Sequence, residues 1–185
     1  EALLAGGDSG VSFVTSVNLT FTPADWQTAQ TVQVQGQLDH VDDGDRSYAI
    51  VLGPAASDDP PYQGIGATSF GARSVDVDVA GFSVTPLGPL ATFEPDGAAT
   101  FSVRLTTIPQ QGYVTLMVWT TDGNEVRVST PTDTGGSYAF LGFGADDWDV
   151  PQVVTVQGRD DTLLDGARPY TVSVQYQSGD ARYAS

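Results

Sequence analysis

Four aspartates lie within one short segment, Asp39–Asp45, at positions 39, 42, 43 and 45. A second segment carries Asp160, Asp161 and Asp165. Carboxylates this close together repel one another unless water or a cation separates them. Ca²⁺ is the natural counterion, because it takes roughly six to eight oxygen ligands and tolerates irregular geometry. Asp39, Asp42, Asp43 and Asp45, together with the three aspartates of the second segment, are therefore candidate calcium ligands.

The Asp-Gly pairs in both segments allow a simpler interpretation. Asp43-Gly44 and Asp165-Gly166 are dipeptides that favour tight turns, in which an aspartate needs no ligand. The first segment does not match an EF-hand loop, since Val41 stands where a ligand should be and Ile50 occupies the twelfth position. A calcium site and a solvated turn are both open at this point.

Other chemistry has little support in the composition. The chain has no cysteine, so thiolate chemistry is excluded. Its one histidine is His40, so a serine–histidine–aspartate triad would have to use a histidine in an acidic loop. With 7 Lys+Arg against 23 Asp+Glu, nucleic acid is not an expected partner. Glycoside hydrolysis needs two acids facing across a cleft, whereas these acids cluster in one loop. We expect no enzyme activity.

The acidic segments lie inside a long sequence repeat. Leu19–Leu52 aligns without a gap to Leu141–Val174 at an offset of 122 residues, with the Asp-Trp, Gln-Gly and Asp-Gly pairs kept in both copies. A period this long, carrying its own strands and turns, indicates tandem domains rather than a small solenoid repeat. The expected domains are residues 1–80 and 81–185.

Alternating apolar and polar residues predict short strands and no helix. No apolar run is long enough for a transmembrane helix, so we expect no membrane insertion. Strands at this spacing, separated by Gly, Pro and Asp turns, predict an all-β protein built of antiparallel β-sandwiches. The predicted strands are Val17–Thr22, Thr31–Gln37, Ser47–Leu52, Ser74–Val79, Gly81–Thr85 with Ala91–Glu94, Ala99–Thr106, Tyr113–Thr120, Ser137–Gly142, Val153–Arg159 and Tyr170–Tyr176.

The two copies are incomplete in opposite ways. The stretch Gly81–Asp133 has no counterpart before Leu19, and Ser74–Val79 has none after the second copy. We therefore expect a first sandwich that lacks its opening strands and a second that lacks its last strand. Two explanations are open: the chain is part of a longer repeat array, or the missing strands come from a neighbouring subunit by strand addition.

Several motifs of the repeat resemble one known family. They are Leu-Thr-Phe-Thr-Pro with Asp-Trp at 19–26, Gln-Thr-Val-Gln-Val-Gln-Gly at 30–36, the acidic loop followed by Tyr48, and Ser57-x-Asp59-x-x-Tyr62. This pattern resembles the Calx-beta-like repeats of large bacterial surface proteins and adhesins. The resemblance implies tandem seven-stranded antiparallel sandwiches, similar in shape to immunoglobulin-like domains, with Ser74–Val79 closing the first.

The resemblance also implies further calcium ligands. In Calx-beta domains the acidic loop binds Ca²⁺ together with an acid at the end of the first strand and acids in a neighbouring loop. Glu94 matches the first of these positions and Asp122 the second. Asp78, at the end of the closing strand, would supply a ligand at the junction between the domains.

These observations predict a structural role. We expect an extracellular or cell-surface repeat module of a stalk, adhesin or filament, stiffened by Ca²⁺ and joined to neighbouring repeats or identical subunits by strand addition. The alternatives are a self-polymerising filament subunit completed by donor strands, and a glycan- or protein-binding module. Trp26 and Trp148 bear on the last alternative, since a loop tryptophan can stack on a sugar; their repeated position favours packing over the end of each sandwich instead.

Overall fold

The computed structural model describes residues 2–8, 11–162 and 166–184, with side chains described from Ser16 onward apart from Ser178. Nearly all regular structure is β-strand, which confirms the predicted all-β class; the one short helix among these residues is the 3-10 segment η1 (Ala181–Ala184). No helix in the described part of the chain has the length and hydropathy needed to cross a bilayer. The chain forms two compact units, Glu1–Asp39 with Asp43–Asp76, and His40–Asp42 with Val77–Ser185.

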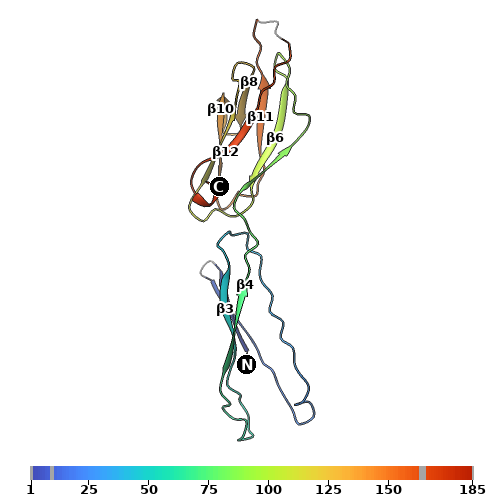
Figure 1. Cartoon of the computed structure of the whole chain (residues 1–185), viewed down its shortest axis with the longest axis vertical. Helices are drawn as coiled ribbons and strands as arrows, with labels where there is room; N and C mark the ends of the chain where they lie inside the picture. Colours follow the sequence, from blue (N-terminus) through green and yellow to red (C-terminus); the bar gives the residue numbers. More distant parts are fainter. Residues whose placement is uncertain (1, 9–10, 163–165, 185) are drawn as a thin grey trace. The chain divides into compact units, whose positions relative to one another are not determined.

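The second unit is a sandwich of two antiparallel sheets (Figure 1). One sheet has the strand order β5-β6-β11-β8-β9 and the other has the order β10-β7-β12. The strands are β5 (Phe82–Pro86), β6 (Ala98–Leu105), β7 (Val114–Thr120), β8 (Val126–Thr130), β9 (Asp133–Gly136), β10 (Tyr138–Phe143), β11 (Gln152–Gly158) and β12 (Val172–Ser178).

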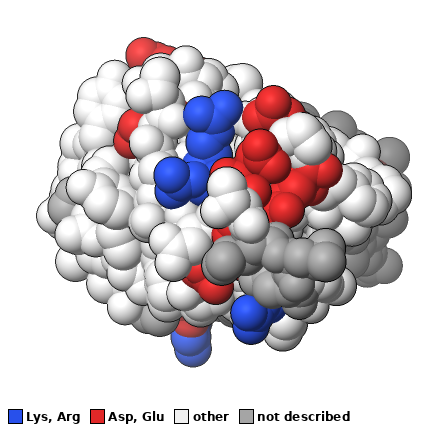
Figure 2. All heavy atoms as spheres, turned by 90° about the horizontal axis from the view of Figure 1, so that it is seen from above, with Lys and Arg blue, Asp and Glu red and all other residues white. Residues whose placement is uncertain are grey.

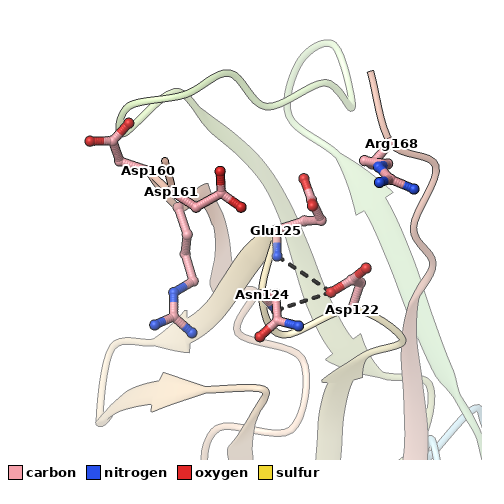
Figure 3. A pocket seen from close by; sticks show the side chains of 7 residues that line it. Asp122, Asn124, Glu125, Asp160, Asp161 and Arg168 are labelled. Atoms are coloured by element: carbon pink, nitrogen blue, oxygen red, sulfur yellow. Dashed lines mark hydrogen bonds between the residues drawn. The ribbon is translucent and has the colours of Figure 1, made fainter. Parts of the chain in front are cut away.

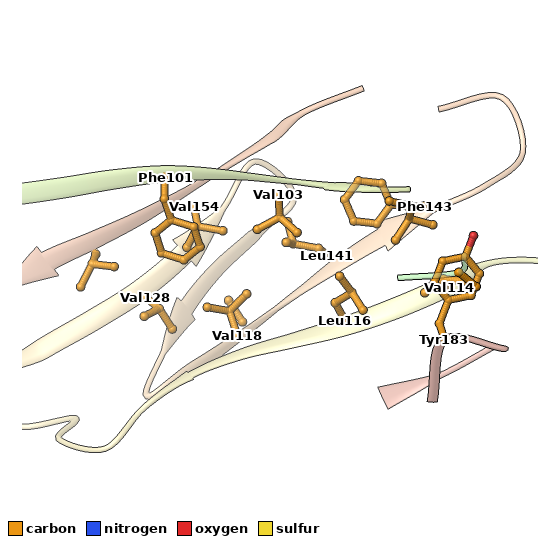
Figure 4. Packing of buried hydrophobic residues seen from close by; sticks show 14 of the residues in the cluster. Phe101, Val103, Val114, Leu116, Val118, Val128, Leu141, Phe143, Val154 and Tyr183 are labelled. Atoms are coloured by element: carbon orange, nitrogen blue, oxygen red, sulfur yellow. The ribbon is translucent and has the colours of Figure 1, made fainter. Parts of the chain in front are cut away.

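The core of the second unit follows from strict alternation along its strands. In β7, Val114, Leu116 and Val118 are buried while the residues between them are half-buried, because successive side chains of a strand point to opposite faces. Buried side chains from both sheets meet between the layers, among them Val103 and Leu141 (Figure 4). Every buried hydrophobic residue described for this core cluster belongs to the second unit.

The first unit is a single antiparallel sheet of order β2-β1-β3-β4. Its strands are β1 (Ala2–Asp8), β2 (Val11–Val17), β3 (Arg46–Leu52) and β4 (Thr68–Ser74). Within the described residues no second sheet covers it, and large apolar side chains stay exposed. They are Val17, Phe21, Trp26, Val34, Leu38, Tyr62, Ile65, Phe70 and Val75.

The sheet of the first unit repeats the smaller sheet of the second unit in order and register. Ala2 of β1 pairs with Val17 on one side and Leu52 on the other. Val118 of β7 pairs with Ala139 and Val174, the same two positions 122 residues later. The sequence repeat is therefore also a repeat of sheet topology: β2, β1 and β3 correspond to β10, β7 and β12, and β4 has no counterpart among the described strands of the second unit.

Several strand predictions are wrong. Four predicted strands are not strands in the structure, apart from Val17 and Ser74, which end β2 and β4. The four segments are Val17–Thr22, Thr31–Gln37, Ser74–Val79 and Ala91–Glu94. The first unit does not lack all of its opening strands, since β1 and β2 precede the repeat. Its closing strand is β4, which begins six residues before the predicted one. After β4 ends, the amide of Asp76 donates to Oδ1 of Asp45 (2.8 Å) instead of to a neighbouring strand. The short strands β8 and β9 were not predicted.

The failure at Thr31–Gln37 has a clear physical cause. Its counterpart in the repeat is β11, which pairs with β6 on one side and β8 on the other. No described strand of the first unit corresponds to β6 or β8. An extended segment becomes a strand only when neighbours satisfy its backbone donors and acceptors, so nearly the same sequence is a central strand in one unit and irregular in the other.

The matched pair Phe143 and Phe21 tests this difference. Phe143 is 0% exposed and Phe21 is 52% exposed. Phe143→Ala should lower the free energy of unfolding by about 3–5 kcal/mol, because it leaves a cavity in a closed core. Phe21→Ala should change it by less than about 0.5 kcal/mol. Urea denaturation measures both, and equal effects would contradict the assignment of the core to the second unit.

Candidate functional site

The acidic loop at Asp39–Asp45 is divided between the two units. His40–Asp42 belongs to the second unit, where Val41 is buried. The amide of Ala80 donates to Oδ2 of Asp42 (2.8 Å), and the amide of Ile108 donates to the carbonyl of His40 (2.8 Å). The Asp42 carboxylate therefore fixes residues 40–42 to the backbone of the second unit.

The other acids of this loop lie in the first unit. Asp43 forms an ion pair with Arg46 (2.7 Å), and Asp45 forms one with Arg73. Oδ2 of Asp76 accepts hydrogen bonds from the amides of Asp43 (3.0 Å) and Gly44 (2.7 Å), and Gly44 has a positive φ of 80° that suits glycine. These contacts shape the turn before β3, as the simpler interpretation of the Asp-Gly pair expects.

A different group of acids gathers around a pocket in the second unit. Figure 2 shows acidic side chains next to basic ones on the face that it views. The pocket has a volume of about 420 Å³ and is lined by Asp122, Asn124, Glu125, Arg159, Asp160, Asp161 and Arg168 (Figure 3). Three predicted calcium ligands, Asp122, Asp160 and Asp161, thus come together from loops distant in sequence.

The walls of this acidic pocket are fixed by backbone hydrogen bonds. Oδ1 of Asp122 accepts from the amides of Asn124 (3.0 Å) and Glu125 (3.4 Å), which closes a tight turn before β8. Nη1 of Arg159 donates to the carbonyl of Gly123 (2.6 Å), and its amide donates to the carbonyl of Glu125 (2.8 Å). The acidic side chains therefore project from an ordered turn.

The remaining predicted ligands lie apart from this pocket. Glu94 is exposed and lines an apolar groove of the second unit, and Asp78 and Asp39 are half-buried. Asp165 lies outside the described residues. Among the described residues, no three histidine, cysteine, aspartate or glutamate side chains are arranged to hold a metal ion.

The most buried acid is one that the sequence analysis did not single out as a site. Asp180 is 1% exposed and precedes η1. Its carboxylate accepts from Nη2 of Arg182 (2.8 Å) and from the amides of Gln110 (2.8 Å) and Gln111 (3.2 Å). Nη1 of Arg182 continues the network to the carbonyl of Asp42 (2.7 Å). This Asp180 network fastens the C-terminal turn and residues 40–42 to the β6–β7 loop.

The electrostatics of Asp180 follow from this geometry. Burial alone would raise its pKa, but hydrogen bonds from the Arg182 side chain and from backbone amides outweigh it, so the pKa of Asp180 lies below its usual value. The pKa of Arg182 is raised, with the hydrogen bond to Asp180 as the largest cause. The pair is charged at neutral pH and stabilises the folded form.

The turn at residues 59–62 of the first unit recurs at residues 180–183 of the second unit. Both copies have the same local hydrogen bond, but only the second is buried. The amide of Tyr183 donates to the carbonyl of Asp180 (3.2 Å), and the amide of Tyr62 donates to that of Asp59 (3.0 Å). Tyr183 is 2% exposed, with its hydroxyl bonded to Thr107, whereas Tyr62 is 56% exposed.

The two tryptophans differ in the same way. Trp148 packs against the core, with its ring centroid 5.4 Å from that of His40, as the packing interpretation predicts. Trp26 is 62% exposed, so the packing prediction is wrong for this residue. Its turn is nevertheless the same, because Oδ1 of Asp25 accepts from the amide of Thr22 (2.6 Å) as Oδ1 of Asp147 accepts from that of Gly144 (2.6 Å).

Comparison of the chain with protein-family models, with curated proteins and with solved structures found no match in any of the three.

The Asp180 network predicts a pH-dependent stability. Because the pKa of Asp180 is lower in the folded chain than in the unfolded chain, its contribution is present above the unfolded value of about 4 and is lost as the pH falls through the folded value. Asp180→Asn should reduce the free energy of unfolding at pH 7 by about 2–4 kcal/mol, and the difference from the parent protein should shrink on acidification below about pH 4.

Asp59→Asn is the matched control, since Asp59 occupies the equivalent turn and is exposed. It should change stability by less than about 0.5 kcal/mol at any pH. Chemical denaturation between pH 3 and pH 7 measures both variants. A pH-independent deficit in Asp180→Asn would show that shape, rather than charge, sets the role of Asp180.

Proposed function

We propose that this protein is an extracellular structural module built from Calx-beta-like sandwich repeats, and that it serves in a surface stalk, adhesin or filament. The observation that carries the proposal is the shared register of β2-β1-β3 and β10-β7-β12. Two copies of one sheet pattern along a chain, each with the same Asp-Trp and Asp-x-x-Tyr turns, are the organisation of a repeat protein. A role in reach or display follows from repetition of a whole module.

The antiparallel ladders supply the mechanical property that such a role needs. β7, the central strand of its sheet, pairs along its length with β10 and β12, and β11 pairs with both β6 and β8. Pulling such a strand out breaks many backbone hydrogen bonds together and exposes the core. A closed unit of this kind resists extension, whereas the first unit gains this resistance only with a second layer.

In this proposal, the first unit is one layer of a sandwich, and a second sheet would cover its exposed apolar side chains. Phe21, Val34 and Tyr62 correspond to side chains that are buried in the second unit, yet all three are exposed. In the second unit the strands that bury their counterparts come from Gly81–Thr130. We infer that an equivalent segment covers the first unit in the assembled protein, from a neighbouring repeat or, in the filament alternative, from an identical subunit.

A chimera tests this repeat relationship. In the chimera, residues 1–15 are replaced with a copy of Gly81–Ser137. Ser16 is equivalent to Tyr138 in the repeat, so the added strands precede Ser16 as the originals precede Tyr138. The amides of Thr31–Gln37 should then become protected from hydrogen exchange, as the β11 amides are.

The control for the chimera carries Phe101→Asp and Val103→Asp in the added copy only, which prevents the added strand from packing. In this control the amides of Thr31–Gln37 should exchange as fast as in the parent chain. A chimera that behaves like its control would remove the repeat proposal.

We further propose that Ca²⁺ binds at the acidic pocket of the second unit. The support is that Asp122, Asp160 and Asp161 line one pocket together with Glu125. Binding would require these side chains to turn toward a common ion and would neutralise their mutual repulsion. Ca²⁺ at one hundred times its Kd would add about 2.7 kcal/mol to the free energy of unfolding.

Thermal melting in Ca²⁺ and in EDTA tests the calcium proposal. The Tm should be at least several degrees higher with Ca²⁺. Asp122→Asn combined with Asp161→Asn should abolish the difference. Asp146→Asn combined with Asp149→Asn removes the same charge elsewhere on the second unit and should preserve it. Equal Tm values for the parent protein in Ca²⁺ and in EDTA would rule the site out.

A further inference from the structure

The second unit has a large apolar groove along one edge of its sandwich. The groove has a volume of about 1040 Å³ and runs between β12 and the inner face of β5 and β6. We call it the edge groove; its apolar walls include Phe82, Val84, Phe101, Tyr170, Val172 and Val174. Val84 and Phe93 remain 46% and 70% exposed, although they face the same groove. Apolar side chains that stay exposed beside an unpaired strand edge could be covered by a further extended segment.

The edge groove exists because the two sheets have different numbers of strands. The larger sheet has five strands and the smaller one has three. β10 lies next to β8 and β9, where the amide of Phe140 donates to Asp133 (3.1 Å), so the smaller sheet covers that side. β12 is therefore the outer strand on the β5 side, and no described strand pairs with its outer edge. Among the described strands, β12 therefore has an unpaired edge beside the groove.

The first unit shows what occupies the equivalent position. There the strand that corresponds to β12 is β3, and β4 pairs with its outer edge. Phe70 lies opposite Ile50, which corresponds to Val172 in the repeat. Residues directly opposite in an antiparallel pair point to the same face of the sheet. A strand of the β4 type beside β12 would therefore direct the position of Phe70 into the groove, next to Val172.

We propose that the edge groove binds an extended segment with the sequence character of β4, paired antiparallel to β12. The segment would place its apolar side chains, at the positions of Phe70 and Ala72, over Val84 and Phe101. Main-chain hydrogen bonds to β12 would give affinity, and the apolar pockets would give register. The inference rests on the proposed repeat relationship and names the partner of the second unit.

A peptide with the sequence of residues 66–79, labelled with a fluorophore, tests the proposal against the full chain. Fluorescence anisotropy should show saturable binding, and amides of β12 should exchange more slowly in the complex. Val84→Glu in the chain, or Phe70→Glu in the peptide, should weaken binding at least tenfold. Val84 is partly exposed, so its replacement should leave the fold intact.

The matched control is Val153→Glu. Val153 is also partly exposed and lies on β11 but does not line the groove, so this variant should bind the peptide as the parent chain does. Absence of binding, or equal loss in Val84→Glu and Val153→Glu, would overturn the proposal. Concentration-dependent self-association of the chain without peptide binding, seen by sedimentation, would also overturn it and would assign the groove to a second copy.

Disulfide trapping tests the register, because the natural chain contains no cysteine. The repeat predicts that Ser69 of the peptide lies opposite Ser173, as Ser69 lies opposite Val51 in the first unit. A Ser69→Cys peptide should crosslink to Ser173→Cys chain and much less to Gln175→Cys chain. The chimera experiment reports on the first unit, and the peptide experiment reports on β12 of the second unit. The groove proposal can therefore fail while the repeat proposal stands, and the two failures are distinguishable.

Discussion

A β-strand needs backbone partners at its edges and a packed layer on at least one face, and the two units differ in how far they provide both. The second unit meets this constraint in β11, which has β6 and β8 at its edges and contributes Val154 to the core. The first unit does not meet it at Thr31–Gln37, where the same alternation produces no strand. Backbone pairing and layer packing are thus what convert this repeated sequence into a folded sandwich.

Local turns form in both units because they need only nearby residues. Asp25 and Asp147 hold equivalent turns before the tryptophans, and Asp59 and Asp180 begin equivalent turns before the tyrosines. The two tyrosines differ in burial, because the hydroxyl of Tyr183 is hydrogen-bonded to Thr107 whereas Tyr62 is exposed to solvent. Short-range hydrogen bonds survive without a second layer, whereas burial requires one.

The acidic character of the chain takes three structural forms. Asp42 and Asp180 are tied into the second unit by backbone amides and Arg182, and Asp43 and Asp45 pair with arginines at the turn before β3. A third group projects around one pocket beside Arg159 and Arg168. The buried carboxylate of Asp180 is held by Arg182 together with the backbone amides of Gln110 and Gln111.

The amino-acid sequence was enough to predict the all-β class, the repeat and the turn residues, because alternation and turn chemistry are local properties. It located β3, β6, β7, β10, β11 and β12 to within a few residues. It also selected Asp122, Asp160 and Asp161, and the structure brings these three to one pocket.

Tertiary contacts determined which extended segments became strands and which acidic side chains came together. β8 and β9 exist because β11 and β8 provide edges for them, and Asp180 became the central buried acid because η1 folds against the β6–β7 loop. The acids of Asp39–Asp45 are close in sequence, yet the fold divides them between two units. Pairing and burial depend on residues far apart in the chain, so no local pattern could have specified them.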